Sequence, residues 1–115
     1  MSSSMSVNSA LRLLTRAKRY RYTFSNKKRV SLTLNQLTIL FLLEDIRQNG
    51  GEELYLTKIA AELDTSIGTA SAAVISLEKQ NLVKRRIKRT HQRGRQLTIP
   101  EIRSQGIKIV AAFMA

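Results

Sequence analysis

Residues 57–79 contain two short helix-forming stretches joined by a tight turn, and this pattern constrains the fold most strongly. Apolar residues recur at helical spacing on both sides of Asp64-Thr65-Ser66. Thr57 can cap the first helix, and Ser66 can cap a second helix over residues 67–79. A short helix, a tight turn and a second helix together predict a helix-turn-helix.

A longer helix is predicted before this unit. Thr33 is a good N-cap, Gln36 lies at the capping-box position, and Leu32 with Leu37 can form a hydrophobic staple. The body of this helix, residues 37–43, is apolar on nearly all sides, so we expect it to be central and buried. Asn49-Gly50-Gly51 ends it.

Two further segments flank these helices on the N-terminal side. Apolar residues at helical spacing predict a first helix over about residues 7–22, with a polar connection over 26–30. Leu54 and Leu56 alternate with polar neighbours, which favours a short strand over residues 52–56.

The C-terminal third predicts a basic β-hairpin followed by a last helix. Asn81 can adopt the left-handed backbone conformation that ends a helix. Two predicted strands then flank a polar turn around His91. Pro100 suits the first position of the last helix. We therefore expect a mainly α fold with a small β-hairpin wing (α+β), a winged helix-turn-helix. One domain would span residues 1–115, divided into a basic N-terminal helix and connection (1–30), a helical core (31–82), the wing (83–99) and the C-terminal helix (100–115).

Charge separates the plausible partners. The 115 residues carry 20 Lys and Arg against eight Asp and Glu, a formal net charge of +12. Residues 1–30 and 84–95 contain no acid, and the segment between them is slightly acidic. Two basic blocks around a compact middle favour a polyanion partner.

Residues 32–106 resemble the MarR family of winged-helix transcription regulators. Leu32-Thr33-x-x-Gln36 is similar to the family's opening of its second helix, and residues 63–71 to its turn and recognition-helix start. Residues 77–85 are similar to its "Leu-Glu-x-x-Gly-Leu-Val-x-Arg" run, with Asn81 in place of Gly, and residues 99–101 lie near its exit from the wing. Arg93 falls at the family's wing arginine, and His91 replaces the usual Asp.

The resemblance implies a homodimer joined by the first and last helices, with the second helix of the helix-turn-helix in the major groove of DNA. It also implies that some members bind small effectors between helices, although no residue here indicates one. The candidate dimer residues are Leu11, Leu14, Ile109, Val110 and Phe113. The apolar C-terminal end has a second interpretation, in which it packs on its own domain.

The candidate DNA-binding residues lie on the second helix and on the hairpin. They are Ser66, Gly68, Thr69, Ser71, Ala72, Lys84, Arg85, Arg86, Lys88, Arg89, Arg93 and Arg95. Small side chains permit close approach to the duplex, and hydroxyls can contact base edges or phosphates. No Arg, Lys, Asn or Gln lies between Ser66 and Glu78, so we expect modest direct readout and an affinity dominated by phosphate contacts.

The function that follows is a double-stranded DNA-binding transcription regulator, a dimeric repressor or modulator in the cytoplasm. The alternatives are a low-specificity architectural or RNA-binding protein and a winged-helix protein-interaction module. The chain has no Cys and one His, and we interpret Glu44, Asp45, Glu52 and Glu53 as solvated surface, so we expect neither an enzyme nor a cofactor or metal site. No apolar run is long enough to span a bilayer, so no membrane partner is expected.

Overall fold

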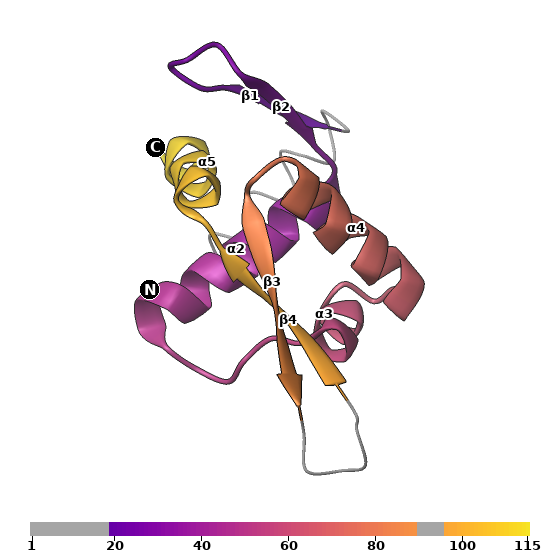
Figure 1. Ribbon diagram of the computed structural model, residues 1–115. Helices are drawn as coiled ribbons and strands as arrows, with labels where there is room; N and C mark the ends of the chain where they lie inside the picture. Colours follow the sequence, from indigo (N-terminus) through magenta and orange to yellow (C-terminus); the bar gives the residue numbers. More distant parts are fainter. Residues whose placement is uncertain (1–18, 90–95) are drawn as a thin grey trace.

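A computed structural model describes residues 19–89 and 96–115. These residues form four helices and two separate antiparallel hairpins (Figure 1). The elements in chain order are β1 (Tyr20–Thr23), β2 (Arg29–Leu32), α2 (Leu34–Asn49), α3 (Leu56–Glu62), α4 (Ile67–Lys79), β3 (Val83–Arg89), β4 (Gln96–Ile102) and α5 (Ser104–Met114). The β1–β2 hairpin lies at one end of the molecule and the β3–β4 hairpin at the other, with the helices between them.

Helix α2 begins and ends where the sequence predicts. The Thr33 side chain accepts a hydrogen bond from the Gln36 N–H, and the Gln36 side chain accepts one from the Thr33 N–H at 2.9 Å, which completes the capping box. Gly50, with φ of 74°, terminates the helix. The apolar body of α2 is buried, as expected for a central helix.

Helices α3 and α4 form the predicted helix-turn-helix. Ser66 caps α4 by accepting a hydrogen bond from the Thr69 N–H at 3.1 Å. Asn81 has the left-handed conformation that ends α4, with φ of 62°. The prediction of a strand over residues 52–56 was wrong. This segment pairs with no strand in the described structure, and α3 begins at Leu56, with Tyr55 rather than Thr57 at its N-cap.

The wing consists of β3 and β4, paired from Val83 opposite Ile102 to Arg89 opposite Gln96. The prediction that Pro100 opens the last helix was wrong. Pro100 lies within β4 opposite Arg85, and α5 begins at Ser104. A two-stranded ladder leaves one edge of each strand unpaired, and a residue without an N–H is tolerated there.

The β1–β2 hairpin replaces part of the predicted first helix. Residues 20–22 were expected to end that helix but form β1, with Tyr20 opposite Leu32 and Tyr22 opposite Val30. Tyrosines at alternate positions share one face of a strand, where they pack against two buried aliphatic residues. Residues 7–18 of the expected helix lie outside the described part of the chain.

One hydrophobic core joins all these elements. Its largest fully buried side chains come from β2, α2, α3, α4, the connection after α4, β3 and α5: Leu32, Leu37, Ile39, Leu40, Ile59, Val74, Leu77, Leu82, Val83 and Ile109. Within the described residues, no helix is long and apolar enough to cross a bilayer.

Candidate nucleic-acid interface

The first turns of α4 present small, mostly exposed residues at the surface. Ser66, Gly68, Thr69 and Ala72 are exposed, and Ser71 is partly buried. A Cβ added at Gly68 would meet nothing closer than the Ser66 Oγ at 3.9 Å. The backbone of this turn can therefore approach a partner closely.

The two hydroxyls at this turn have different duties. The Ser66 hydroxyl accepts from the Thr69 N–H and donates to the Thr69 Oγ1 at 2.9 Å. Most of the hydrogen-bonding capacity of the Ser66 hydroxyl is therefore used within the helix cap. The Thr69 hydroxyl still has its own hydrogen to donate to an external acceptor.

Two large aliphatic side chains, one on α4 and one on the wing, are exposed. Ile67 is 52% exposed at the start of α4, and Ile87 is 61% exposed on the wing. A thymine methyl group is the feature of the major groove that an aliphatic side chain can contact.

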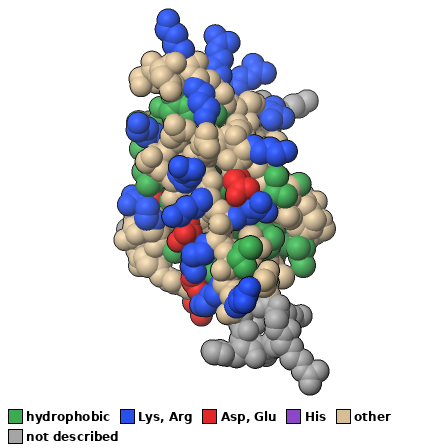
Figure 2. All heavy atoms as spheres, viewed as in Figure 1, with side chains coloured by type: hydrophobic (Ala, Val, Ile, Leu, Met, Phe, Trp, Pro, Cys, Tyr) green, Lys and Arg blue, Asp and Glu red, His purple; other side chains and the backbone are tan. Residues whose placement is uncertain are grey.

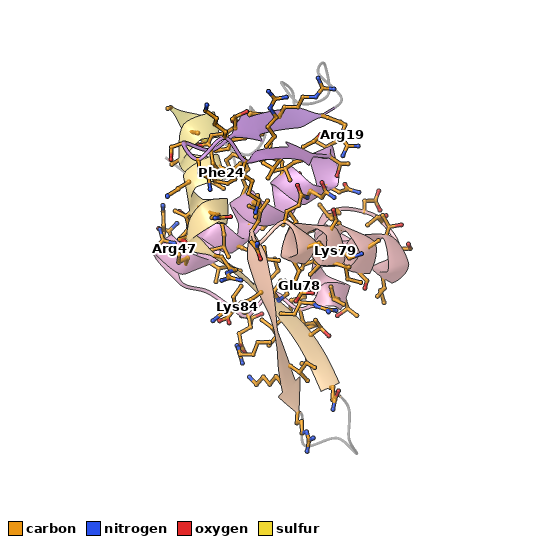
Figure 3. All side chains as sticks on the ribbon, turned by 45° about the horizontal axis from the view of Figure 1, so that its top comes forward. Arg19, Phe24, Arg47, Glu78, Lys79 and Lys84 are labelled. Carbon is orange, nitrogen blue, oxygen red and sulfur yellow. The ribbon has the colours of Figure 1, made fainter. Side chains whose placement is uncertain are left out.

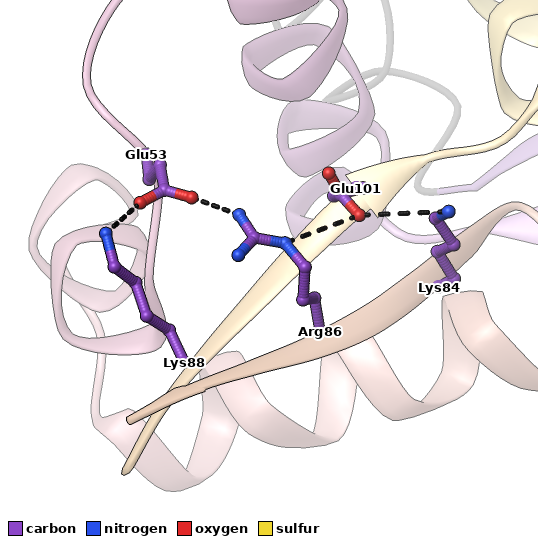
Figure 4. A network of polar contacts seen from close by, with 5 residues as sticks. All are labelled: Glu53, Lys84, Arg86, Lys88 and Glu101. Atoms are coloured by element: carbon purple, nitrogen blue, oxygen red, sulfur yellow. Dashed lines mark hydrogen bonds and ion pairs between the residues drawn. The ribbon is translucent and has the colours of Figure 1, made fainter. Parts of the chain in front are cut away.

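The two faces of β3 have different electrostatic surroundings. Lys84, Arg86 and Lys88 share one face, where they meet Glu53 and Glu101 (Figure 4). Glu53 accepts from Lys88 Nζ at 2.8 Å and pairs also with Arg86. Glu101 lies 3.7 Å from Arg86 Nε and 3.9 Å from Lys84 Nζ. Three predicted phosphate ligands are therefore already paired with carboxylates.

The opposite face of β3 carries Arg85, Ile87 and Arg89. Arg85 Nη2 lies 3.0 Å from Glu78 Oε1 of α4, so this face turns toward the second helix of the helix-turn-helix. Figure 3 shows Glu78 beside the base of the wing. Arg89 is exposed and has no carboxylate within ion-pair distance among the described residues.

Cations also set the ionisation of Glu53. The hydrogen bond from Lys88, followed by that from Arg86, lowers the pKa of the Glu53 carboxyl below its ordinary value of 4.5. The carboxylate is therefore charged at neutral pH and attracts both wing cations.

A cavity of about 330 Å³ lies between the C-terminal half of α2, the Glu53–Leu54 segment and the wing. Leu43, Ile99 and Ile102 contribute apolar walls, and Arg47 and Arg86 also line it. Elsewhere on the described surface, no cluster of His, Asp and Glu could hold a metal ion.

The candidate dimer residues of α5 pack on the protein itself. Ile109 is fully buried and Val110 is 7% exposed, both within the core. The Phe113 ring lies 4.8 Å from Tyr20 and 5.7 Å from Phe41, each in an edge-on arrangement. This packing matches the second interpretation of the apolar C-terminal end, and the dimer seam stays a prediction.

Several candidates lie outside the described residues. They are Arg93 and Arg95 of the wing, and Leu11 and Leu14 of the expected seam. His91, at the expected turn, lies there as well.

Sequence reasoning missed the carboxylates that pair with the wing. Glu53 is more than thirty residues from its partners Arg86 and Lys88. Glu78 and Arg85 are closer in sequence, but a turn separates α4 from β3. The one signal in the sequence was that successive side chains of a strand point to opposite faces, which divides the basic residues of β3 between two faces.

Comparison with known families gives the chain its identity. The model of the MarR family matches residues 32–94, which is more than half of the chain and includes α2, α3, α4 and β3. The chain belongs to the MarR family. Members of this family are winged-helix transcription regulators. A comparison with curated protein sequences finds no match.

Solved structures share the fold of this MarR-family protein. MepR of Staphylococcus aureus, a transcription regulator of the multidrug efflux pump MepA, is 23% identical with a TM-score of 0.59. That similarity covers 96% of this chain and 67% of MepR. A MepR–DNA complex is 24% identical over 96% of this chain and 66% of that one, with a TM-score of 0.57.

A third similar structure is that of another transcriptional regulator. The transcriptional regulator BldR from Sulfolobus solfataricus is 20% identical with a TM-score of 0.56, over 96% of this chain and 64% of BldR. This MarR-family protein therefore spans about two thirds of the length of these relatives. At these identities the similarity establishes the shared winged-helix fold.

Proposed function

We propose that this chain binds double-stranded DNA as a transcription regulator, with α4 in the major groove and the wing on the flanking backbone. The observation that carries this proposal is the exposed first turn of α4, where Ser66, Gly68 and Thr69 leave the backbone open to close approach. MepR, which shares the fold, has been solved in complex with DNA.

The contact with DNA would combine weak base reading with strong phosphate binding. Thr69 has a free donor for a base acceptor, and Ile67 can contact a thymine methyl group. Arg89 and, beyond the described residues, Arg93 and Arg95 would bind phosphates or enter a minor groove. Lys84, Arg86 and Lys88 would contribute only by exchanging their carboxylate partners for phosphates.

A homodimeric repressor or modulator acting in the cytoplasm is the finer form of this proposal. Two-fold symmetry suits palindromic DNA sites. Because Ile109 and Val110 are buried, the seam would use residues at the margin of α5, such as the half-buried Phe113 and the exposed Met114. Leu11 and Leu14 remain candidates for the same seam.

A second candidate is a low-specificity architectural protein. The observation that favours it is the absence of Arg, Lys, Asn and Gln from α4 between Ser66 and Glu78. These are the side chains that make bidentate contacts with guanine and adenine.

Fluorescence anisotropy tests both functions. A labelled random-sequence duplex is titrated with the protein at low and moderate salt and then competed with fragments of the source genome. Steep weakening with salt supports DNA binding through phosphates. One strongly competing fragment then supports a regulator, and equal competition by all fragments supports an architectural protein. No binding at low salt refutes both.

A further inference from the structure

The β1–β2 hairpin presents a cationic face to solvent. Along its strands, Arg21 pairs with Ser31 and Thr23 with Arg29, and these side chains alternate with the inward-facing tyrosines. Arg19 continues the same side beyond β1, where its Nε donates to the Ser31 Oγ at 2.8 Å. We name this surface the outer hairpin face; its cations are Arg19, Arg21 and Arg29.

The outer hairpin face has no carboxylate partner. All eight Asp and Glu residues of the chain lie within the described ranges, and the first of them is Glu44. The ion pairs in these ranges involve Arg47, Lys58 and the wing cations, and none reaches Arg19, Arg21 or Arg29. Figure 2 shows Lys and Arg side chains without acidic neighbours at the end of the molecule that carries this hairpin.

This pattern is the reverse of that on the base of the wing. There Lys84, Arg86 and Lys88 sit next to Glu53 and Glu101. The outer hairpin face therefore carries uncompensated positive charge, whereas much of the charge on the wing base is compensated.

The strands that carry the cations of the outer hairpin face are packed against the core. The inner face of the hairpin places the Tyr20 ring 4.8 Å from Phe113 and buries Val30 and Leu32 in the core. At the turn, Lys28 Nζ donates to the Gln80 carbonyl at the end of α4, at 3.4 Å. The spacing of Arg21 and Arg29 is thus set by a packed ladder.

The hairpin adjoins the proposed DNA-reading surface. β2 leads through Thr33 into α2, and the first turn of α2 shares a shallow groove with Thr69, Ala72 and Ala73 of α4. Figure 3 shows Arg19 at the open end of the hairpin, opposite the turn and on the side where α4 lies. A duplex bound along α4 would meet this end of the hairpin as its backbone leaves the major groove.

We propose that the outer hairpin face binds the phosphate backbone of duplex DNA flanking the segment that α4 reads. The inference rests on the proposed DNA-binding function. It assigns a contact surface to residues 19–31, which precede the part of the chain that matches the family model. Arginine suits this task because its guanidinium presents several donors to phosphate oxygens.

The test compares two double variants with equal loss of charge. Arg21→Gln with Arg29→Gln removes two cations of the outer hairpin face. Arg103→Gln with Lys108→Gln is the matched control, because both side chains are exposed and neither forms an ion pair within the described residues. Thermal melts confirm that both variants fold like the parent protein.

Binding to a labelled random-sequence duplex is then measured across a range of salt concentrations. For the hairpin variant we expect the slope of log affinity against log salt to fall by about 1.8, the value for two lost phosphate contacts, with no comparable change in the control. Equal slopes for both variants and the parent would overturn the inference while leaving DNA binding intact. A parent protein that binds no duplex would instead refute the proposed function.

A measurement with single-stranded RNA tests the remaining alternative, in which the outer hairpin face binds RNA. If the hairpin variant loses affinity for a labelled single-stranded RNA but keeps the parent's slope on duplex DNA, the face serves RNA and the proposal is wrong. A slope change confined to duplex DNA supports it.

Discussion

Arg85 on the wing and Glu78 on α4 are joined by an ion pair of 3.0 Å between Nη2 and Oε1. The pair links the wing to the helix that we propose to enter the major groove. Both side chains are partly exposed, so the pair contributes little stability, on the order of 0–1 kcal/mol. We expect its larger effect to be on DNA binding, because a phosphate would have to compete with Glu78 for Arg85.

Glu78→Gln is therefore expected to tighten DNA binding. With its carboxylate partner removed, Arg85 can contact phosphate without losing an ion pair, and the salt slope should steepen by about 0.9, the value for one added contact. Glu62→Gln is the matched control, since it changes the net charge equally but Glu62 forms none of the ion pairs in the described structure. Equal tightening by both variants would show that net charge alone is responsible.

Substitutions at Thr69 and Ser66 should affect DNA binding and folding stability differently. Thr69→Val keeps the shape but removes the free hydroxyl donor, so we expect weaker DNA binding with an unchanged melting temperature. Ser66→Ala removes the cap of α4 and should cost about 1 kcal/mol of unfolding free energy. Urea unfolding and anisotropy measure the two effects. A Thr69→Val variant with parental affinity for every duplex would argue against base or phosphate contact by that hydroxyl.

Ile67 should make binding sensitive to the thymine methyl group. The parent protein is expected to prefer an alternating dA·dT duplex over the same duplex with deoxyuridine, which lacks only that methyl. In Ile67→Ala this preference should disappear, while affinity for the deoxyuridine duplex stays similar. Anisotropy measures the affinity of both proteins for both duplexes. If Ile67→Ala still prefers the thymine duplex, the Ile67 side chain does not contact the methyl group.

Gly106 and Gly68 should respond oppositely to alanine. A Cβ at Gly106 would lie 2.6 Å from the Leu82 carbonyl oxygen and 2.9 Å from Ile102 Cγ1, so Gly106→Ala forces backbone to move. We expect destabilisation of about 1–3 kcal/mol, as for overpacked cores. Gly68→Ala meets no such contact and should stabilise α4 by about 0.5–1 kcal/mol. Urea midpoints distinguish the two, and equal effects would contradict the packing described for α5.

The pairing of Glu53 predicts a pH dependence of stability. Because the folded protein holds the pKa of Glu53 below its ordinary 4.5, these pairs stabilise the fold above that pH. Their contribution is lost as the pH falls below 4.5 and through the lowered pKa of the folded state. Glu53→Gln should therefore be less stable than the parent at pH 7 but not at strongly acidic pH. A difference that persisted in acid would show that Glu53 acts by packing rather than by charge.

The features that sequence predicted well are local. The capping box of Thr33 and Gln36, the Ser66 cap and the left-handed Asn81 each depend on a few neighbouring residues. Helix α4 consequently spans the predicted residues 67–79.

The features that sequence missed depend on partners far along the chain. Tyr20 and Tyr22 fell within the helix predicted over residues 7–22, but β2 and Phe113 offer their rings an apolar surface in the fold. Pro100 looked like a helix start because nothing nearby showed that Arg85 lies opposite it. The same distance hid the carboxylates that meet the wing cations. Local sequence patterns could locate the candidate interface, but they could not show which of its cations are paired with carboxylates.

The continuity of β2 with α2 sets a lower limit on the smallest autonomous fragment. Leu32 ends β2 with no exposed surface, and the next residue, Thr33, caps α2. A polypeptide trimmed to the start of the family's sequence match at residue 32 would lose the strand opposite Leu32 and, with it, Val30 and Phe24 of the core. In this protein the segment that matches the family model therefore begins inside the packed core rather than at its edge.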